Sequence, residues 1–87
     1  MARNPYNIKN YEYLYNVKSV IKFNKPVHKK GKAFYVDRYS LAYLTMYGYD
    51  SPKSDSFVLT IAKANILKKF AKSGGKLISI EIINYYH

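Results

Sequence analysis

Apolar and polar residues alternate along the first patterned stretch of the chain, YEYLYNVKSVIKF at residues 11–23. Aromatic or β-branched side chains occupy all odd positions except Ser19, and most even positions are polar. This period of two, with these residue types, predicts a long strand. Leu14, Val17 and Ile21 also fit helical spacing, so a helix at the beginning of this stretch is the alternative.

A second, shorter strand is expected at AFYVD, residues 33–37, after an interruption at Pro26. Proline cannot donate to a strand ladder, so the first strand ends there or lies at a sheet edge. The residues HKKGK, 28–32, have the composition of a turn in which Gly31 takes a positive φ. We therefore predict that the two strands form a β-hairpin with a lysine-rich tip.

The stretch DRYSLAYLTMYG, residues 37–48, is predicted to be a short helix. Asp37 or Ser40 can cap its N-terminus, and Gly48 can end it. Residues 49–56 are rich in Asp and Ser and contain Pro52, so they are expected to form a loop. One face of this helix would carry Tyr39, Tyr43, Met46 and Tyr47.

A second helix is predicted from Ser54 or Asp55 to the Ser-Gly-Gly stop at residues 73–75. Lysines late in this helix suit the negative end of its dipole. The final stretch, KLISIEIINYY at residues 76–86, reads as a strand with apolar residues on both faces and is expected at the centre of the sheet. The apolar stripe of the helix consists of Leu59, Ala62, Ile66, Leu67 and Phe70.

The expected elements follow one another in the order β-β-α-α-β. This order predicts a single α+β domain over residues 1–87. Two helices would pack on one face of a small, mostly antiparallel sheet of about three strands.

Composition indicates a folded domain, because 48% of the residues are hydrophobic. The first ten residues, MARNPYNIKN, lack the apolar segment of a secretory signal. No apolar run approaches the roughly 20 residues that a membrane span needs. We therefore expect a soluble, cytoplasmic protein, of a cell or of an infected host cell, with no membrane partner.

Charge changes this picture most. Fifteen Lys and Arg residues stand against five Asp and Glu residues, which gives a net charge of +10. Between Glu12 and Asp37 there is no acidic residue, although six lysines lie there. Such an excess attracts polyanions, chiefly nucleic acid. The alternative is a solvated lysine-rich surface that keeps an edge strand from aggregating.

The sequence offers little for catalysis or for a cofactor. There is no cysteine, and His28 and His87 are the only imidazoles. The acidic residues are scattered, and no group of residues has the spacing of metal ligands. The SGGK segment, residues 73–76, follows a helix and therefore lacks the geometry of a phosphate-binding loop. We predict a non-enzymatic protein with no metal and no cofactor.

The leading hypothesis is a small nucleic-acid-binding protein that contacts the phosphate backbone through the lysine-rich hairpin and a basic helix face. Lysine is a point charge, and Arg3 and Arg38 are the only arginines, so positioning on the backbone is favoured over base readout. Tyr13, Tyr15 and Tyr35 are the candidates for stacking on bases. The candidate phosphate contacts are Lys18, Lys22, Lys25, His28, Lys29, Lys30, Lys32, Arg38, Lys68, Lys69 and Lys72.

Two other classes of function stay open. The first is an inhibitor from a phage or mobile element, of the anti-CRISPR type, that binds a host nucleoprotein complex. The second is a small RNase toxin, in which His28 would act with Lys29, Lys30 and Tyr35. A tyrosine-rich edge strand that pairs with a second copy would give a homodimer. The sequence does not choose between DNA and RNA or between single and double strands.

Overall fold

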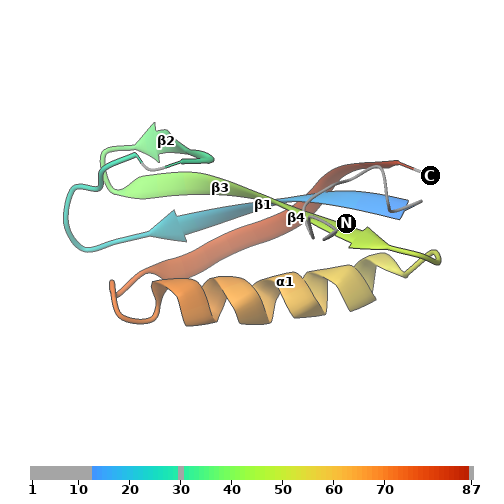
Figure 1. The fold of residues 1–87 in the computed structure, drawn as a ribbon. Coiled ribbons are helices and arrows are strands. Elements are labelled where there is room, and N and C mark those ends of the chain that lie inside the picture. The colour runs from blue at the N-terminus through green and yellow to red at the C-terminus, as the bar shows by residue number, and fades with distance from the viewer. Residues whose placement is uncertain (1–12, 30, 87) are drawn as a thin grey trace, which may run out of the picture.

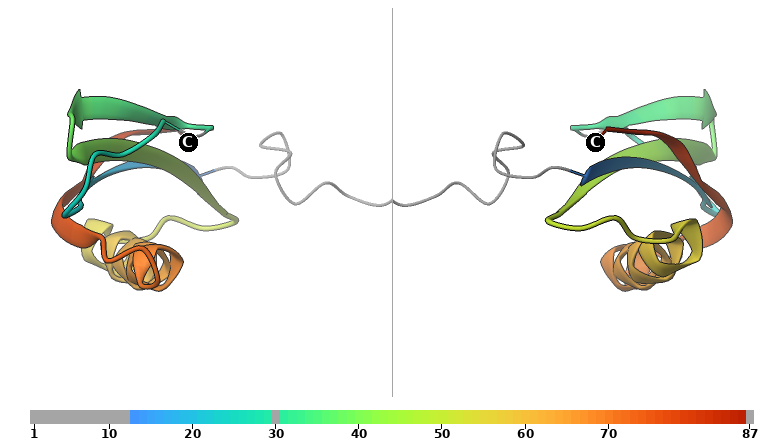
Figure 2. Two further views of the ribbon diagram at one scale, coloured as in Figure 1. Left: turned by 90° about the vertical axis from the view of Figure 1, so that its left-hand side faces the viewer. Right: turned by 90° about the vertical axis from the view of Figure 1, so that its right-hand side faces the viewer.

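Four antiparallel strands and one helix make up the fold in the computed structural model, which describes residues 13–29 and 31–86 (Figure 1). The sheet has the order β2-β3-β1-β4, and α1 packs on one face of it (Figure 2). This is a small α+β fold, but the predicted ββααβ order with two helices and about three strands is wrong. The elements are β1 (Tyr13–Lys22), β2 (Ala33–Asp37), β3 (Ser40–Tyr49), α1 (Asp55–Phe70) and β4 (Lys76–Tyr86).

The strand prediction for the first patterned stretch is confirmed over Tyr13–Lys22, and residues 11 and 12 lie outside the described residues. The alternation arises because odd positions of β1 face α1. Tyr15, Val17 and Ile21 are each at most 2% exposed, whereas Lys18 and Lys22 project from the other face or from the strand end. The period-two pattern therefore reports which face of this central strand is buried.

The predicted hairpin between the first two strands is wrong. β1 pairs with β3 and β4, and β2 pairs only with β3, so β3 lies between β1 and β2. The connection of residues 23–32 crosses the end of β3 instead of making a tight turn. Its backbone is tied to the β2–β3 turn, because Phe23 N donates to Tyr39 O (2.9 Å) and Val27 N donates to Arg38 O (3.0 Å). Within it, Gly31 has the expected positive φ, 54°.

The predicted helix over residues 37–48 is also wrong, because Ser40–Tyr49 form β3. The tyrosines that fit helical spacing also fit a period of two when Thr45 and Tyr49 are included. Tyr43, Thr45 and Tyr47 lie opposite Ser19, Val17 and Tyr15 of β1 in an unbroken antiparallel register. Aromatic and β-branched residues favour such a strand. Gly48, expected to end a helix, pairs with Leu14.

The last strand is confirmed, but its predicted central position is wrong, since β4 is at a sheet edge. Two register shifts explain the misleading pattern. The pairing skips Ile83 between Asn84 and Ile82, and skips Ile78 between Ser79 and Leu77. Each bulge inserts one residue and changes the alternation. Ile78 and Ile83 are consequently 56% and 45% exposed, and the strand looks apolar on both faces without being buried on both.

The second predicted helix is confirmed as α1, with Ser54 as its N-cap. The Ser54 hydroxyl accepts a hydrogen bond from Phe57 N (3.2 Å), which satisfies one of the free amides of the first turn. The helix ends at Phe70, three residues before the predicted stop. Its buried side chains are Val58, Ala62 and Ile66, whereas Leu67 of the predicted stripe is exposed.

The core lies between α1 and the sheet, around Tyr15, Val17, Val58 and Ala62. Tyr15 fixes the start of the helix to β1, because its hydroxyl donates to Lys53 O (3.1 Å) and accepts from Lys53 N (2.9 Å). The only helix among the described residues is too short and too polar to cross a membrane.

Burial raises the pKa of the Tyr49 phenol above its ordinary value of 10.0, and the charges of Tyr47 and Tyr15 add to the rise. The folded state therefore holds this proton more tightly than the unfolded chain does. Its contribution to stability is complete below about pH 10 and is lost as the pH rises through the folded-state pKa. Equilibrium denaturation should show a shallower alkaline loss of stability for Tyr49→Phe than for the wild type. Equal losses would contradict this prediction.

Candidate nucleic-acid interface

Cationic side chains from five parts of the chain meet at one end of the molecule. The register brings the last residue of β1, Lys22, opposite Ser40 at the start of β3 and Lys76 at the start of β4. The C-terminal end of α1, just before β4, and the β2–β3 turn reach the same end (Figure 1). We call this the cationic end; its residues, all exposed, are Lys22, Lys25, Lys29, Arg38, Lys68, Lys69, Lys72 and Lys76.

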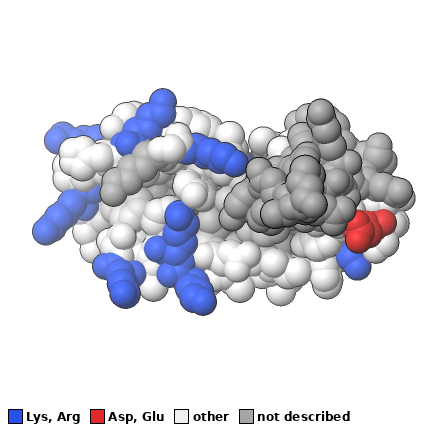
Figure 3. Space-filling view, in the orientation of Figure 1, with Lys and Arg blue, Asp and Glu red and all other residues white. Residues whose placement is uncertain are grey.

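The same separation of charge is visible on the surface. Lys and Arg side chains gather over the half of the molecule that holds β2, the 23–32 connection and the end of α1, while acidic atoms lie at the opposite tip (Figure 3). Asp50 and Asp55 flank the β3–α1 connection at that far tip. Among the described residues, Asp37 directly precedes Arg38 of the cationic end, and its carboxylate accepts a hydrogen bond from Tyr39 N (2.7 Å). The positive charge of this end is therefore largely uncompensated.

Helix α1 supplies its cations from its last turn and from the residues that follow. Lys68 and Lys69 lie in the last turn, where the helix dipole is negative and favours positive side chains. The chain then turns through Gly74, which has a φ of 73°, and enters β4 at Lys76. This short connection brings the helical lysines close to the lysine that begins the edge strand.

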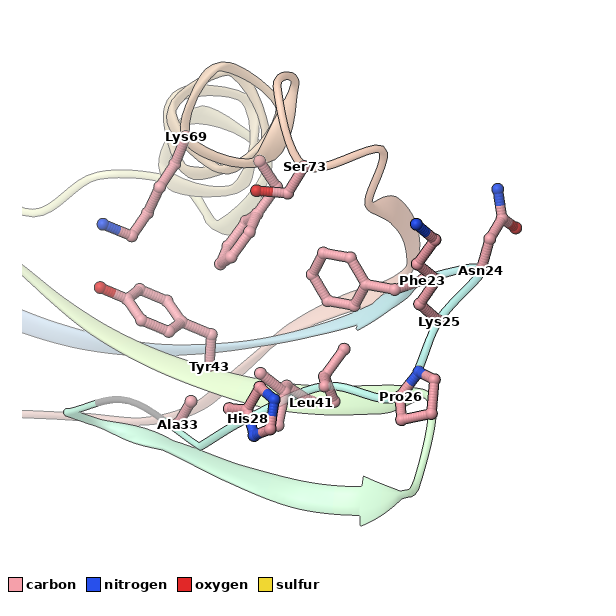
Figure 4. Close-up of a pocket in the computed structure, with 12 residues that line it drawn as sticks. Phe23, Asn24, Lys25, Pro26, His28, Ala33, Leu41, Tyr43, Lys69 and Ser73 are labelled. Carbon is pink, nitrogen blue, oxygen red and sulfur yellow. The ribbon is translucent and has the colours of Figure 1, made fainter.

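A cavity of about 550 Å³ opens at the cationic end, between the 23–32 connection, β3 and the end of α1 (Figure 4). Its walls are mainly apolar. Figure 4 shows the rings of Phe23 and Tyr43 on two sides of it, with Leu41 and Ala33 between them on the sheet. Lys25 and Lys69 line it as well, and the ammonium group of Lys69 lies 5.3 Å from the centre of the Tyr43 ring.

The structure brings most of the predicted phosphate contacts together. Lys22, Lys25, Lys29, Arg38, Lys68, Lys69 and Lys72 belong to the cationic end, and His28 is exposed and lines the cavity. Lys32 is exposed just before β2. Lys18 lies apart on the sheet face that α1 does not cover, with its ammonium group 5.9 Å from the centre of the Phe34 ring. Lys30 lies outside the described residues.

The three candidate stacking tyrosines are placed differently. Tyr15 is 2% exposed in the core, so it cannot offer its ring to a base. Tyr13 is half-buried and packs against the same core. Tyr35 is exposed, and its hydroxyl accepts a hydrogen bond from Lys29 N (3.0 Å), which ties the connection to β2. Of the three, only Tyr35 is exposed near the cationic end.

The aromatic wall of the cavity was not predicted from the sequence. Phe23 comes from the start of the 23–32 connection, Tyr43 from β3 and Phe70 from the end of α1, and no periodicity connects these segments. The only local signal is that Lys22 and Lys69 directly precede Phe23 and Phe70. A cationic residue directly precedes an aromatic one at these two places and also at Arg38–Tyr39, which is consistent with a mixed aromatic and basic surface.

Gly75 controls the position of one cavity ring. A Cβ atom here would lie 2.6 Å from Cγ2 of Ile21 and 2.8 Å from Cε1 of Phe23. Because Ile21 is buried, Gly75→Ala should shift Phe23 and lower the free energy of unfolding by about 1–3 kcal/mol. Ser73→Ala, at an exposed position of the same connection, should change it by less than about 0.5 kcal/mol. Urea denaturation measures both, and a Gly75→Ala protein as stable as the wild type would contradict the packing described.

In the described ranges, no three His, Asp or Glu side chains gather where they could hold a metal ion. Comparison with protein-family models, with curated proteins and with solved structures finds no match for this chain. The charge and shape of the cationic end are therefore the features that indicate a function.

Proposed function

We propose that this protein binds nucleic acid without catalysis, by placing the phosphate backbone along the cationic end. The observation that carries the proposal is the gathering of exposed lysines from β1, the 23–32 connection, α1 and β4 at one end of the molecular surface. A phosphate chain that lies along this surface releases its condensed counterions, which favours binding most at low salt.

The kind of cation indicates how the strand is held. Arg38 is the only arginine of the cationic end, and its guanidinium carbon lies 5.4 Å from the centre of the Tyr39 ring. The other members are lysines, whose ammonium groups attract phosphates but make few bidentate contacts with base edges. The expected binding therefore positions the protein on the backbone and discriminates weakly between sequences.

Fluorescence anisotropy with labelled DNA and RNA oligonucleotides of several sequences tests the proposal. We expect binding to each, with similar affinities at one salt concentration and a steep loss of affinity between about 50 and 200 mM salt. Affinity that does not change with salt, or no binding at about 50 mM salt, would contradict it. Retention of a protein target by a chain that binds no nucleic acid would instead favour the inhibitor class.

A further inference from the structure

The cavity at the cationic end offers flat aromatic surfaces as well as positive charge. The Phe70 ring packs edge-on against Phe23 (centroids 5.8 Å apart, 73° between planes) and against Tyr43 (5.6 Å, 84°). All three rings are half-buried, so their positions are set by packing while part of each ring stays accessible. Three elements that are distant in sequence thus hold a fixed aromatic wall.

Two cations line this cavity, and one of them lies over an aromatic ring. Lys69 lies over Tyr43, and Lys25 comes from the connection on the other side. Both side chains are exposed, whereas the floor residues Leu41 and Ala33 are 6% and 3% exposed. A ligand seated here would meet apolar and aromatic surface below and ammonium groups at the rim.

We propose, in an inference that rests on the proposed function, that this cavity binds an unpaired base of a single-stranded nucleic acid. The base would lie against the aromatic wall, and its neighbouring phosphates would bind Lys25 and Lys69. A base that displaces Lys69 from the Tyr43 ring frees that ammonium group for a phosphate, so the cation exchanges a π face for an anion. The volume of about 550 Å³ is within the range of about 300–1,000 Å³ that is typical of small-molecule sites.

Charge complementarity and shape together favour this occupant. An inorganic anion would bind the two lysines but leave the three rings unused. An uncharged apolar molecule would use the rings but not the cationic rim. In a duplex, the bases are stacked and paired inside the helix, so only its phosphates could reach the cationic end. A single strand alone presents both an accessible π face and the adjoining phosphates.

The experiment compares three probes with the wild-type protein at about 0.1 M salt: a single-stranded oligothymidylate, an abasic strand of the same length and a duplex. Stacking of one base should make the single strand bind about fivefold to a hundredfold more tightly than the abasic strand. Equal binding of the single strand and the abasic strand overturns the base site but leaves the proposed function standing. Binding of none of them overturns both.

A pair of variants locates the base. Tyr43→Leu removes a ring from the wall, and Tyr43→Phe keeps it. We expect Tyr43→Leu to lose most of the preference for the base-bearing strand, while its remaining binding matches that of the abasic strand. Tyr43→Phe should retain the preference. A preference that survives in a folded Tyr43→Leu protein overturns the assignment to this cavity. The wild-type comparison with the abasic strand needs no variant, so it decides the question if Tyr43→Leu does not fold.

Discussion

Lys25→Gln combined with Lys69→Gln is expected to weaken the binding of a nucleic-acid strand about twentyfold to sixtyfold at about 0.1 M salt. The two lysines come from the 23–32 connection and from α1, and both line the cavity. Each phosphate contact contributes about 0.7 to 0.9 to the dependence of log K on log salt concentration, and the two losses multiply. The slope itself should fall by about 1.4 to 1.8. Anisotropy titrations at several salt concentrations measure both quantities.

A matched double variant separates the position of the charges from their number. Lys53→Gln combined with Lys63→Gln removes the same net charge from the β3–α1 connection and the middle of α1. Neither residue lines the cavity. Because salt screens interactions beyond about 10 Å at 0.1 M, we expect this variant to lose less than about fivefold in affinity. Equal losses in the two double variants would mean that net charge, and not the cationic end, governs binding.

Tyr15→Ala should be the most damaging single substitution in the core. The side chain is 2% exposed, its ring packs edge-on against Tyr49 with centroids 5.8 Å apart, and its hydroxyl binds both backbone groups of Lys53. Removing the ring leaves a cavity and costs about 3–5 kcal/mol. Domains of this size have a stability of about 5–15 kcal/mol, so the variant should be marginally folded at room temperature. Circular dichroism with thermal denaturation would show this loss.

The smaller change Tyr15→Phe isolates the hydroxyl. It keeps the ring but leaves Lys53 N and O without their phenol partner, which should cost about 1–3 kcal/mol. For a domain of this length, each kcal/mol lowers Tm by about 4–8 °C. Tyr39→Phe is the control, because Tyr39 is 36% exposed at the β2–β3 turn, and its Tm should change by only a few degrees. A Tyr15→Phe protein with the Tm of the wild type would contradict the role given to this hydroxyl.

Local patterns predicted the elements whose environment is simple. From Tyr15 to Ile21 the odd positions of β1 are buried and the even ones are not, so the alternation shows the buried face. Helix α1 has a standard N-cap at Ser54. β3 was mistaken for a helix because its tyrosines satisfy both periods over a short stretch. Each tyrosine of β3 pairs with a β1 residue more than twenty residues away, for example Tyr47 with Tyr15. Tertiary pairing of this kind overrides short-range spacing.

The candidate site, like the fold, could be predicted from the sequence only in part. The charge imbalance predicted a polyanionic partner, and that prediction needs no knowledge of the fold because it depends only on net charge. Most of the lysines chosen from the sequence do converge, but through a crossing connection that no hairpin signal could reveal. The aromatic wall depends on which faces of β3 and α1 pack together. Because residues 37–48 were predicted to be a helix, Tyr43 was not predicted as a site residue. Tyr15 was predicted to stack on a base, but it is buried. Alternation shows which residues share a face of a strand, and it does not show which face is exposed.

Nucleic acid is expected to bind at the cationic end. Titration of the isotopically labelled protein with a single-stranded oligonucleotide, followed by amide chemical shifts, would locate the binding surface. We predict that shifts concentrate in residues 22–29 and 68–76, with little change in residues 50–63. Shifts centred instead on the uncovered sheet face around Phe34 and Met46, or spread evenly over the chain, would contradict this expectation.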